Sequence, residues 1–176
     1  RLNVSTAAPD EATFRQEVER KHAAAIADLD VQFRSQFEKN FPNHKIFSYC
    51  LGSFKNVGYY EYALGILSPS GEGRYVVFLN GPKDDHRLVI VSSFKPAPTA
   101  IGQQPEGPRI QCESIMGLKR LNTAIEGSIG IHGGITPINN HDGICVVDDD
   151  SRSYEHTCYA YDVKKKKFVG IGGWTT

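Results

Sequence analysis

Residues 59–94 read YYEYALGIL-SPSGEG-RYVVFL-NGPKDDH-RLVIVSSF, and this stretch decides the fold class. Its three apolar pieces are rich in Val, Ile, Leu, Tyr and Phe, whereas the pieces between them hold Gly, Pro, Ser, Asn and Asp. Short apolar runs separated by turn residues are typical of strands joined by tight turns. A similar run lies at 45–51, so the sequence predicts an antiparallel meander over 45–94.

The segment before the meander, 10–40, is predicted to form one long amphipathic helix. Its apolar residues recur with steps of three and four, which draws one stripe: Phe14, Val18, Ala25, Ile26, Leu29, Phe33 and Phe37. Pro42 ends the helix, because proline cannot continue the hydrogen-bond ladder. His22 lies within the stripe, where we expect a packed, hydrogen-bonded imidazole rather than a catalytic one. Residues 1–9 are small and polar, and we expect them to be flexible.

The segment after the meander is predicted to add a second set of strands. Residues 95–109 hold four prolines and are expected to form an extended crossing. Within 110–176 we expect strands at 110–115, 144–148, 154–161 and 168–174, and either a short helix or a strand at 118–125. Because the helix at 10–40 must bury its phenylalanines, we predict an α+β fold with that helix packed on an antiparallel β-sheet or sandwich. Residues 1–176 are expected to form a single domain.

Composition and charge exclude several classes of protein. The chain has 176 residues, and its 20 Lys and Arg balance its 20 Asp and Glu. A nucleic-acid-binding domain would normally be basic, so we expect no nucleic-acid partner. Hydrophobic residues make up 40% and charged residues 23%, which is a globular composition. No apolar run is long enough to span a bilayer.

The four cysteines indicate an oxidising compartment. They are even in number and contain no Cys-x-x-Cys pair, so disulfides are favoured over a zinc site and we expect no metal. The chain begins at Arg1 rather than Met, so we expect that a targeting segment is missing, either removed by processing or trimmed away, and a membrane tether through that segment stays open. These features predict a periplasmic or secreted protein.

A hairpin predicts how the cysteines pair. If the two strands extend to 144–150 and 153–161, only Ser151 and Arg152 lie between them, which allows a two-residue turn. Paired residues then have numbers that sum to 303, so that Cys145 faces Cys158. Directly opposite residues in a non-hydrogen-bonded pair have Cα atoms about 4.5 Å apart, within reach of a disulfide. Cys50 and Cys112 are left to pair with each other.

One motif points to an enzyme. Ile131-His132-Gly133, followed by His141-Asp142-Gly143-Ile144-Cys145, resembles the active-site region of L,D-transpeptidases. The resemblance implies a Cys145 thiolate with His132 as its base, in a cysteine-dependent peptidoglycan enzyme. Asp142 stands where that family has its second histidine, and an isoleucine separates the glycine from the cysteine. Because no other catalytic motif is present, we favour a non-enzymatic protein without a cofactor and keep the transpeptidase as the alternative.

An acidic segment is the predicted partner-binding surface. Asp148, Asp149 and Asp150 are adjacent, and a fold tolerates their repulsion where water or a basic partner screens them. The segment lacks the glycine and the closing glutamate of a calcium-binding EF-hand loop. We therefore predict a surface made of the loop 148–153 and the turn 137–143. Its partner-binding residues are Asp148, Asp149, Asp150, Arg152, His141, Asn140 and Tyr154.

The order of the elements resembles a class of small secreted proteins. An N-terminal helix, a meander with an early cysteine and a closing hairpin, Cys158-Tyr-Ala-Tyr-Asp, resemble periplasmic lysozyme inhibitors and toxin-immunity proteins. The resemblance implies a binding protein that plugs the active site of a secreted toxin or cell-wall hydrolase, which is commonly basic. Because tyrosines cluster at Tyr59, Tyr60 and Tyr62 and again near 154–161, a carbohydrate-binding module is a further alternative.

Overall fold

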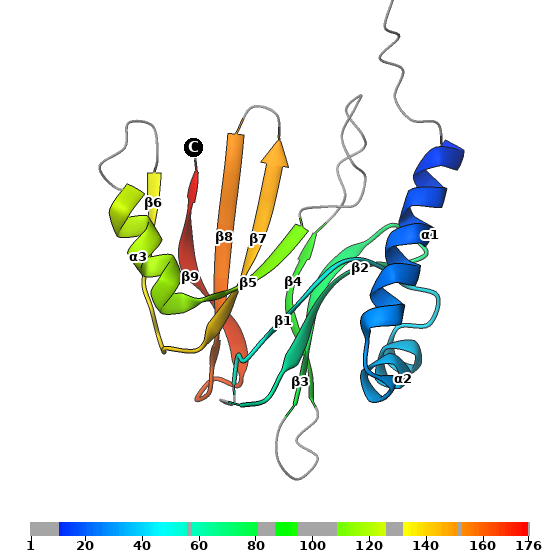
Figure 1. Cartoon of the computed structure of the whole chain (residues 1–176), viewed down its shortest axis with the longest axis horizontal. Coiled ribbons are helices and arrows are strands. Elements are labelled where there is room, and N and C mark those ends of the chain that lie inside the picture. The colour runs from blue at the N-terminus through cyan, green and yellow to red at the C-terminus, as the bar shows by residue number, and fades with distance from the viewer. Residues whose placement is uncertain are drawn as a thin grey trace, which may run out of the picture.

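The computed structural model describes residues 11–55, 58–80, 87–94, 109–125, 132–150 and 153–175 (Figure 1). The predicted flexible N-terminus (1–9) and almost all of the predicted proline-rich crossing (95–109) lie outside these residues. Within them are three helices and nine strands: α1 Glu11–Asp28, α2 Val31–Asn40, β1 Lys45–Gly52, β2 Glu61–Leu67, β3 Gly73–Leu79, β4 Arg87–Phe94, β5 Arg109–Ser114, α3 Ile115–Ile125, β6 His132–Ile135, β7 Asp142–Asp150, β8 Ser153–Asp162 and β9 Lys167–Thr175.

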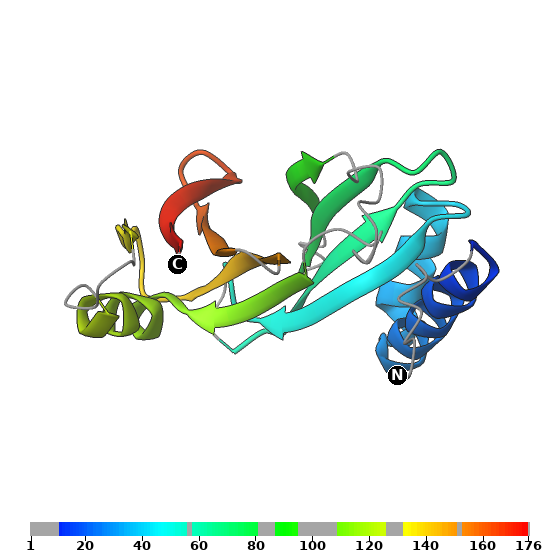
Figure 2. The same ribbon diagram turned by 90° about the horizontal axis from the view of Figure 1, so that it is seen from above.

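The strands form two antiparallel sheets, which confirms the predicted α+β class. The first sheet has the order β1-β2-β3-β4, and this is the predicted meander. The second has the order β5-β7-β8-β9-β6. Figure 2 shows α1 and α2 at one end of the molecule and α3 at the other, with the two sheets between them.

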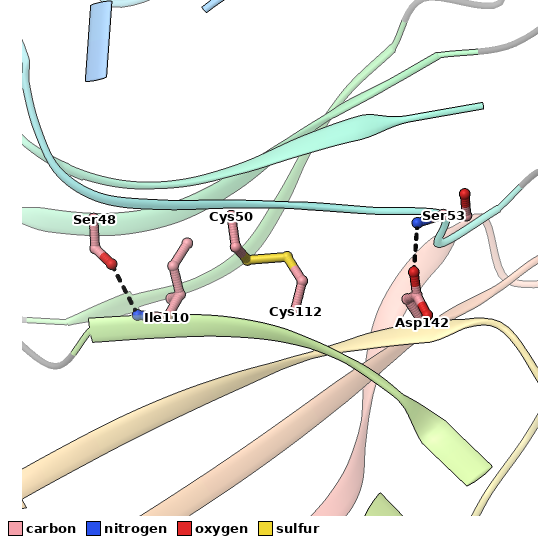
Figure 3. The surroundings of a disulfide bond; sticks show 6 residues. All are labelled: Ser48, Cys50, Ser53, Ile110, Cys112 and Asp142. Carbon is pink, nitrogen blue, oxygen red and sulfur yellow. Dashed lines mark hydrogen bonds between the residues drawn. A yellow bond between two sulfur atoms is a disulfide. The ribbon is translucent and has the colours of Figure 1, made fainter. Parts of the chain in front are cut away.

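The two sheets meet along a seam between β1 and β5. No backbone ladder joins these two strands. Instead, the Cys50–Cys112 disulfide links them, and the backbone N–H of Ile110 donates to Ser48 Oγ over 3.0 Å (Figure 3). Side-chain contacts and one disulfide therefore join β1 to β5, whereas backbone hydrogen bonds join the strands within each sheet.

Three apolar clusters hold the layers together. The central cluster contains residues from both sheets, among them Phe54, Val77, Ile144 and Phe168. The other two lie between the helix pair α1–α2 and the first sheet, and between α3 and the second sheet. Strand β2 is buried on both faces, because successive side chains point alternately to the helix side and to the central cluster.

The prediction of one helix over 10–40 is wrong, because the chain leaves the helix between α1 and α2. Asp30 has an extended backbone (φ −53°, ψ 145°), and its carboxylate accepts a hydrogen bond from the backbone N–H of Gln32 over 3.3 Å. Asp30 is thus the N-cap of α2, a position that aspartate favours. Leu29 and Phe33, on either side of the break, belong to the same apolar cluster, so the periodicity continues through it.

Replacing Asp30 by Ala is expected to lower the free energy of unfolding by about 1 kcal/mol, because the backbone N–H of Gln32 loses its capping acceptor. Asp30→Ser keeps an acceptor at the same position and is expected to stay close to the original stability. Urea unfolding of the two variants measures the difference. Equal losses for Ala and Ser would contradict the capping role.

The predicted cysteine pairing is confirmed for both disulfides. Cys145 lies opposite Cys158 in the β7–β8 ladder, and the two residues form a disulfide with their Cα atoms 4.1 Å apart. The second disulfide joins Cys50 to Cys112. All four cysteines of the chain are therefore oxidised, which is consistent with an extracellular or periplasmic protein.

Candidate functional site

Three connections between strands gather at one end of the molecule. They are the β1–β2 connection, the β6–β7 connection and the β8–β9 turn, which lie together at the lower left of Figure 1. We call this surface the loop end and define it by residues 53–55, 58–60, 136–141 and 163–166. The sequence placed these segments in separate turns, whereas in the fold the β6–β7 connection and the start of β7 are hydrogen-bonded both to the β1–β2 connection and to the end of β8.

Asp142 fixes the β1–β2 connection against the second sheet. Its carboxylate accepts a hydrogen bond from the backbone N–H of Ser53 over 2.9 Å (Figure 3). The backbone N–H of Asp142 donates in return to the Ser53 carbonyl over 3.1 Å. Ser53 Oγ donates to the Tyr59 carbonyl over 2.7 Å, which closes the connection on itself. Ser53 is therefore tied both to the second sheet and to Tyr59, at the other side of the connection.

The other two connections are held in the same way. Asn139 Nδ2 donates to the Tyr161 carbonyl over 3.0 Å, which ties the β6–β7 connection to the end of β8. Asp162 Oδ1 accepts hydrogen bonds from the backbone N–H groups of Lys164 and Lys165, over 2.9 and 3.0 Å, and closes the β8–β9 turn. Side-chain acceptors of this kind are typical of stable turns.

Glu61 supports the loop end from beneath and is fully buried. Its Oε2 accepts hydrogen bonds from the backbone N–H groups of Phe54 and Lys55, and its Oε1 accepts one from Asn80. Burial raises the pKa of this carboxyl, and the three hydrogen bonds oppose that rise. Sequence reasoning missed this residue. Alternation along 59–67 assigns the Glu61 side chain to one face of the strand, but nothing in the sequence shows that both faces of β2 are covered.

Three large apolar side chains are exposed on the loop end, one on each connection. Tyr60 is 70% exposed, Ile138 45% and Val163 56%. Single exposed apolar residues are ordinary on protein surfaces, whereas several gathered at one place mark an interaction site. The hydrogen bonds described above tie neighbouring residues of the three connections in place, so we take the loop end as the candidate interaction surface.

The turn 137–143 and the described part of the segment 148–153 lie toward opposite ends of β7. The turn 137–143 leads into the start of β7, and the loop 148–153 begins near its far end. Nine residues of extended strand place these two ends about 26 Å apart at roughly 3.3 Å per residue. Because β7 is extended, residues at its far end do not lie beside the turn that precedes it. The two predicted segments are therefore separate surfaces.

The predicted site residues divide between these two surfaces. Asn140 is exposed and His141 half-buried on the loop end, where the backbone N–H of His141 donates to Asn139 Oδ1 over 2.9 Å. At the far end of β7, Asp148 is exposed and lies opposite Glu155. The remaining predictions lie outside the described residues or side chains: Asp149, Asp150, Arg152 and Tyr154.

The disulfide contradicts the transpeptidase alternative. Cys145 is bonded to Cys158, and both residues are buried in the cluster beneath α3. A cystine sulfur carries no thiolate and cannot attack a substrate as that alternative requires. The His132 side chain lies outside the described side chains. Among the residues that the structure describes, no group of three or more His, Cys, Asp or Glu could hold a metal ion.

A hollow of about 410 Å³ lies between the helices and the start of β1. It is lined by His22, Ile26, Phe37, Glu38, Phe41, Pro42, Asn43, His44 and Lys45. His22 Nδ1 accepts a hydrogen bond from the backbone N–H of Ile46 over 3.1 Å, as expected for a packed histidine. Burial, reinforced by the charge of Lys45, lowers the pKa of His22. His22 is thus a structural acceptor.

This lowered pKa predicts a pH dependence of stability. Above about pH 6.5 the imidazole is neutral in both the folded and the unfolded chain. As the pH falls below that value, the unfolded chain takes up the proton more readily, so stability decreases until the folded-state pKa is passed. His22→Gln keeps an acceptor for the Ile46 N–H and is expected to flatten the stability profile between pH 7 and 5. An unchanged slope in urea unfolding would contradict this role.

Comparison of the chain with protein-family models, curated proteins and solved structures gave no match. Among the described helices, none combines the length and apolar character needed to cross a bilayer.

Proposed function

We propose that the chain is a binding protein that inhibits, or gives immunity to, a toxin or cell-wall enzyme acting outside the cytoplasm. The observation that carries the proposal is the loop end, where Tyr60, Ile138 and Val163 are exposed on three connections fixed by hydrogen bonds. A surface ordered before binding loses little conformational entropy when its partner docks. Loops of this kind suit the plugging of an enzyme cleft.

A periplasmic or secreted location supports this role. Both disulfides need an oxidising compartment in which to persist. Periplasmic lysozyme inhibitors and toxin-immunity proteins, which the element order resembles, act in that compartment. We propose the same compartment for this chain.

The loop end favours a protein partner over a carbohydrate. Sugar-binding sites commonly use exposed aromatic rings as platforms. Among the tyrosines whose side chains the structure describes, Tyr60 alone is exposed, whereas Tyr62, Tyr75 and Tyr161 are buried. One ring beside two aliphatic side chains resembles the apolar centre of a protein interface.

The expectation of a basic partner rests on Asp148, Asp149 and Asp150, and we keep it as a proposal for a separate contact at the far end of β7. Replacement of all three by Ser tests it. A loss of affinity relative to the original chain that is larger at low salt than at moderate salt would support such a contact. If the variant and the original chain bind the partner with equal affinity at both salt concentrations, the contact is dismissed.

The functional test uses the oxidised chain and a panel of muramidases, amidases, peptidoglycan endopeptidases and periplasm-acting toxins. We expect stoichiometric inhibition of at least one of these enzymes, measured as its loss of turnover on peptidoglycan or its own substrate. Cleavage of peptidoglycan by the chain alone would instead indicate an enzyme. Binding to soluble glycans without inhibition of any panel member would favour the carbohydrate-binding alternative.

A further inference from the structure

We propose that the loop end recognises an acidic protein surface; this inference rests on the proposed function and names the chemistry of the partner. The β8–β9 turn and the residue after it carry four consecutive exposed lysines, Lys164 to Lys167. Lys166 has a left-handed backbone (φ 53°), which reverses the chain at the tip of the hairpin. Val163, one of the three exposed apolar residues, directly precedes this run.

The acids at this end are occupied by internal hydrogen bonds. Asp162 accepts from the Lys164 and Lys165 backbones, and Asp142 accepts from Ser53. Glu61 is buried beneath the surface. Over the described part of the loop end, the charged side chains that are exposed are those of Lys164, Lys165 and Lys166, whereas Asp142 and Asp162 beside it are half-buried; the whole chain has no net charge. Asp142, Asp162 and Glu61 hold the backbone of the surface by hydrogen bonds. The exposed lysines make its charge positive.

The arrangement of charge and apolar area suits a protein. Interfaces between proteins have an apolar centre and a polar rim, and charges on the rim mainly increase the association rate. Tyr60, Ile138 and Val163 would supply the centre, and the lysines of one turn would supply part of the rim. A nucleic-acid surface would normally spread basic residues over a whole face of a basic domain. The complementary surface therefore carries carboxylates around an apolar area.

The first experiment uses two defined polyanions, poly-L-glutamate and a 20-base-pair DNA duplex, with the intact oxidised chain in 25 mM salt. The test variant is Lys164→Glu/Lys165→Glu/Lys167→Glu. The control variant, Arg15→Glu/Arg20→Glu/Lys39→Glu, makes the same change in net charge on the helices α1 and α2. We expect at least tenfold weaker poly-L-glutamate binding for the test variant and less than a twofold change for the control. Equal effects of the two variants, or tighter binding of the DNA than of poly-L-glutamate, would overturn the proposal.

The second experiment uses the enzyme that the chain inhibits in the panel described above. We expect the lysine variant to associate with that enzyme at least tenfold more slowly at 25 mM salt, and the difference to shrink at 300 mM salt. Unchanged association of the lysine variant, together with loss of inhibition in Tyr60→Ser/Ile138→Ser/Val163→Ser, would overturn the acidic partner while the proposed function stands. Failure of the chain to inhibit any enzyme would count against the proposed function, which the polyanion experiment does not test.

Discussion

Replacing both Cys50 and Cys112 by Ser is expected to lower the free energy of unfolding by about 4 kcal/mol. The two cysteines are 62 residues apart, and closing a loop of that length in the unfolded chain has an entropic effect of this size. The structure adds a local consequence, because no backbone ladder joins β1 to β5. Without the disulfide, the seam depends mainly on side-chain packing and on a few hydrogen bonds, including those of Ser48 and Asp142.

The matched control is the removal of the other disulfide in Cys145→Ala/Cys158→Ala. Its sequence separation is 13, for which the same model gives about 3 kcal/mol. Urea unfolding compares the stabilities, and hydrogen exchange reports on the Ser53 and Ile110 amides at the seam. We expect faster exchange at these amides only in the Cys50/Cys112 variant. Unchanged exchange there would show that the disulfide does not hold the two sheets together.

Replacing Glu61 by Ala is expected to lower the free energy of unfolding by about 3 kcal/mol or more. Three backbone N–H groups, those of Phe54, Lys55 and Asn80, lose their acceptor, and each buried unpaired donor costs about 1–3 kcal/mol. Glu61→Gln can keep its oxygen where two of them converge, so we expect an intermediate loss. Glu113→Ala, at an exposed carboxylate on β5, is the control and should change stability by less than about 0.5 kcal/mol.

The raised pKa of Glu61 gives this prediction a pH signature. Because the folded state holds the proton more tightly than the unfolded chain, Glu61 is most favourable to folding at low pH. Its contribution should decline as the pH rises from about 4.3 through the folded-state pKa, whereas Gln does not titrate. The stability of the original chain relative to Glu61→Gln should therefore fall over this range. A rise over the same range, or a larger loss for Gln than for Ala, would contradict this description of the site.

Local signals in the sequence predicted the parts of the fold that depend on neighbouring residues. The β7–β8 register followed from a turn of two residues, and it correctly placed Cys145 opposite Cys158. The meander over 45–94 also followed from short runs and turns. The break at Asp30 was missed because the apolar period runs through it, and only the capping chemistry of an aspartate marks it. The sequence allowed either a helix or a strand at 118–125, and this segment is part of helix α3.

The candidate site depended on contacts that the sequence does not reveal. Ser53 and Asp142 are 89 residues apart, and nothing local to either predicts their hydrogen bonds. Alternation along a strand would place Tyr60 and Tyr62 on one face, yet Tyr62 is buried and Tyr60, just before β2, is exposed. The predicted turn 137–143 does contribute to the loop end, whereas Asp148, in the other predicted segment, lies near the far end of β7. The two predicted segments are close in the sequence, but the extended strand β7 lies between them and keeps them apart.

The affinity of two matched triple variants for the inhibited enzyme tests most directly whether the loop end binds the partner. One variant, Tyr60→Ser/Ile138→Ser/Val163→Ser, removes the apolar side chains of the loop end. The other, Val31→Ser/Ile90→Ser/Leu121→Ser, removes three exposed apolar side chains elsewhere on the surface. By calorimetry we expect at least a 100-fold loss of affinity for the first variant and less than a threefold change for the second. Original affinity in the first variant, or equal losses in both, would contradict the account.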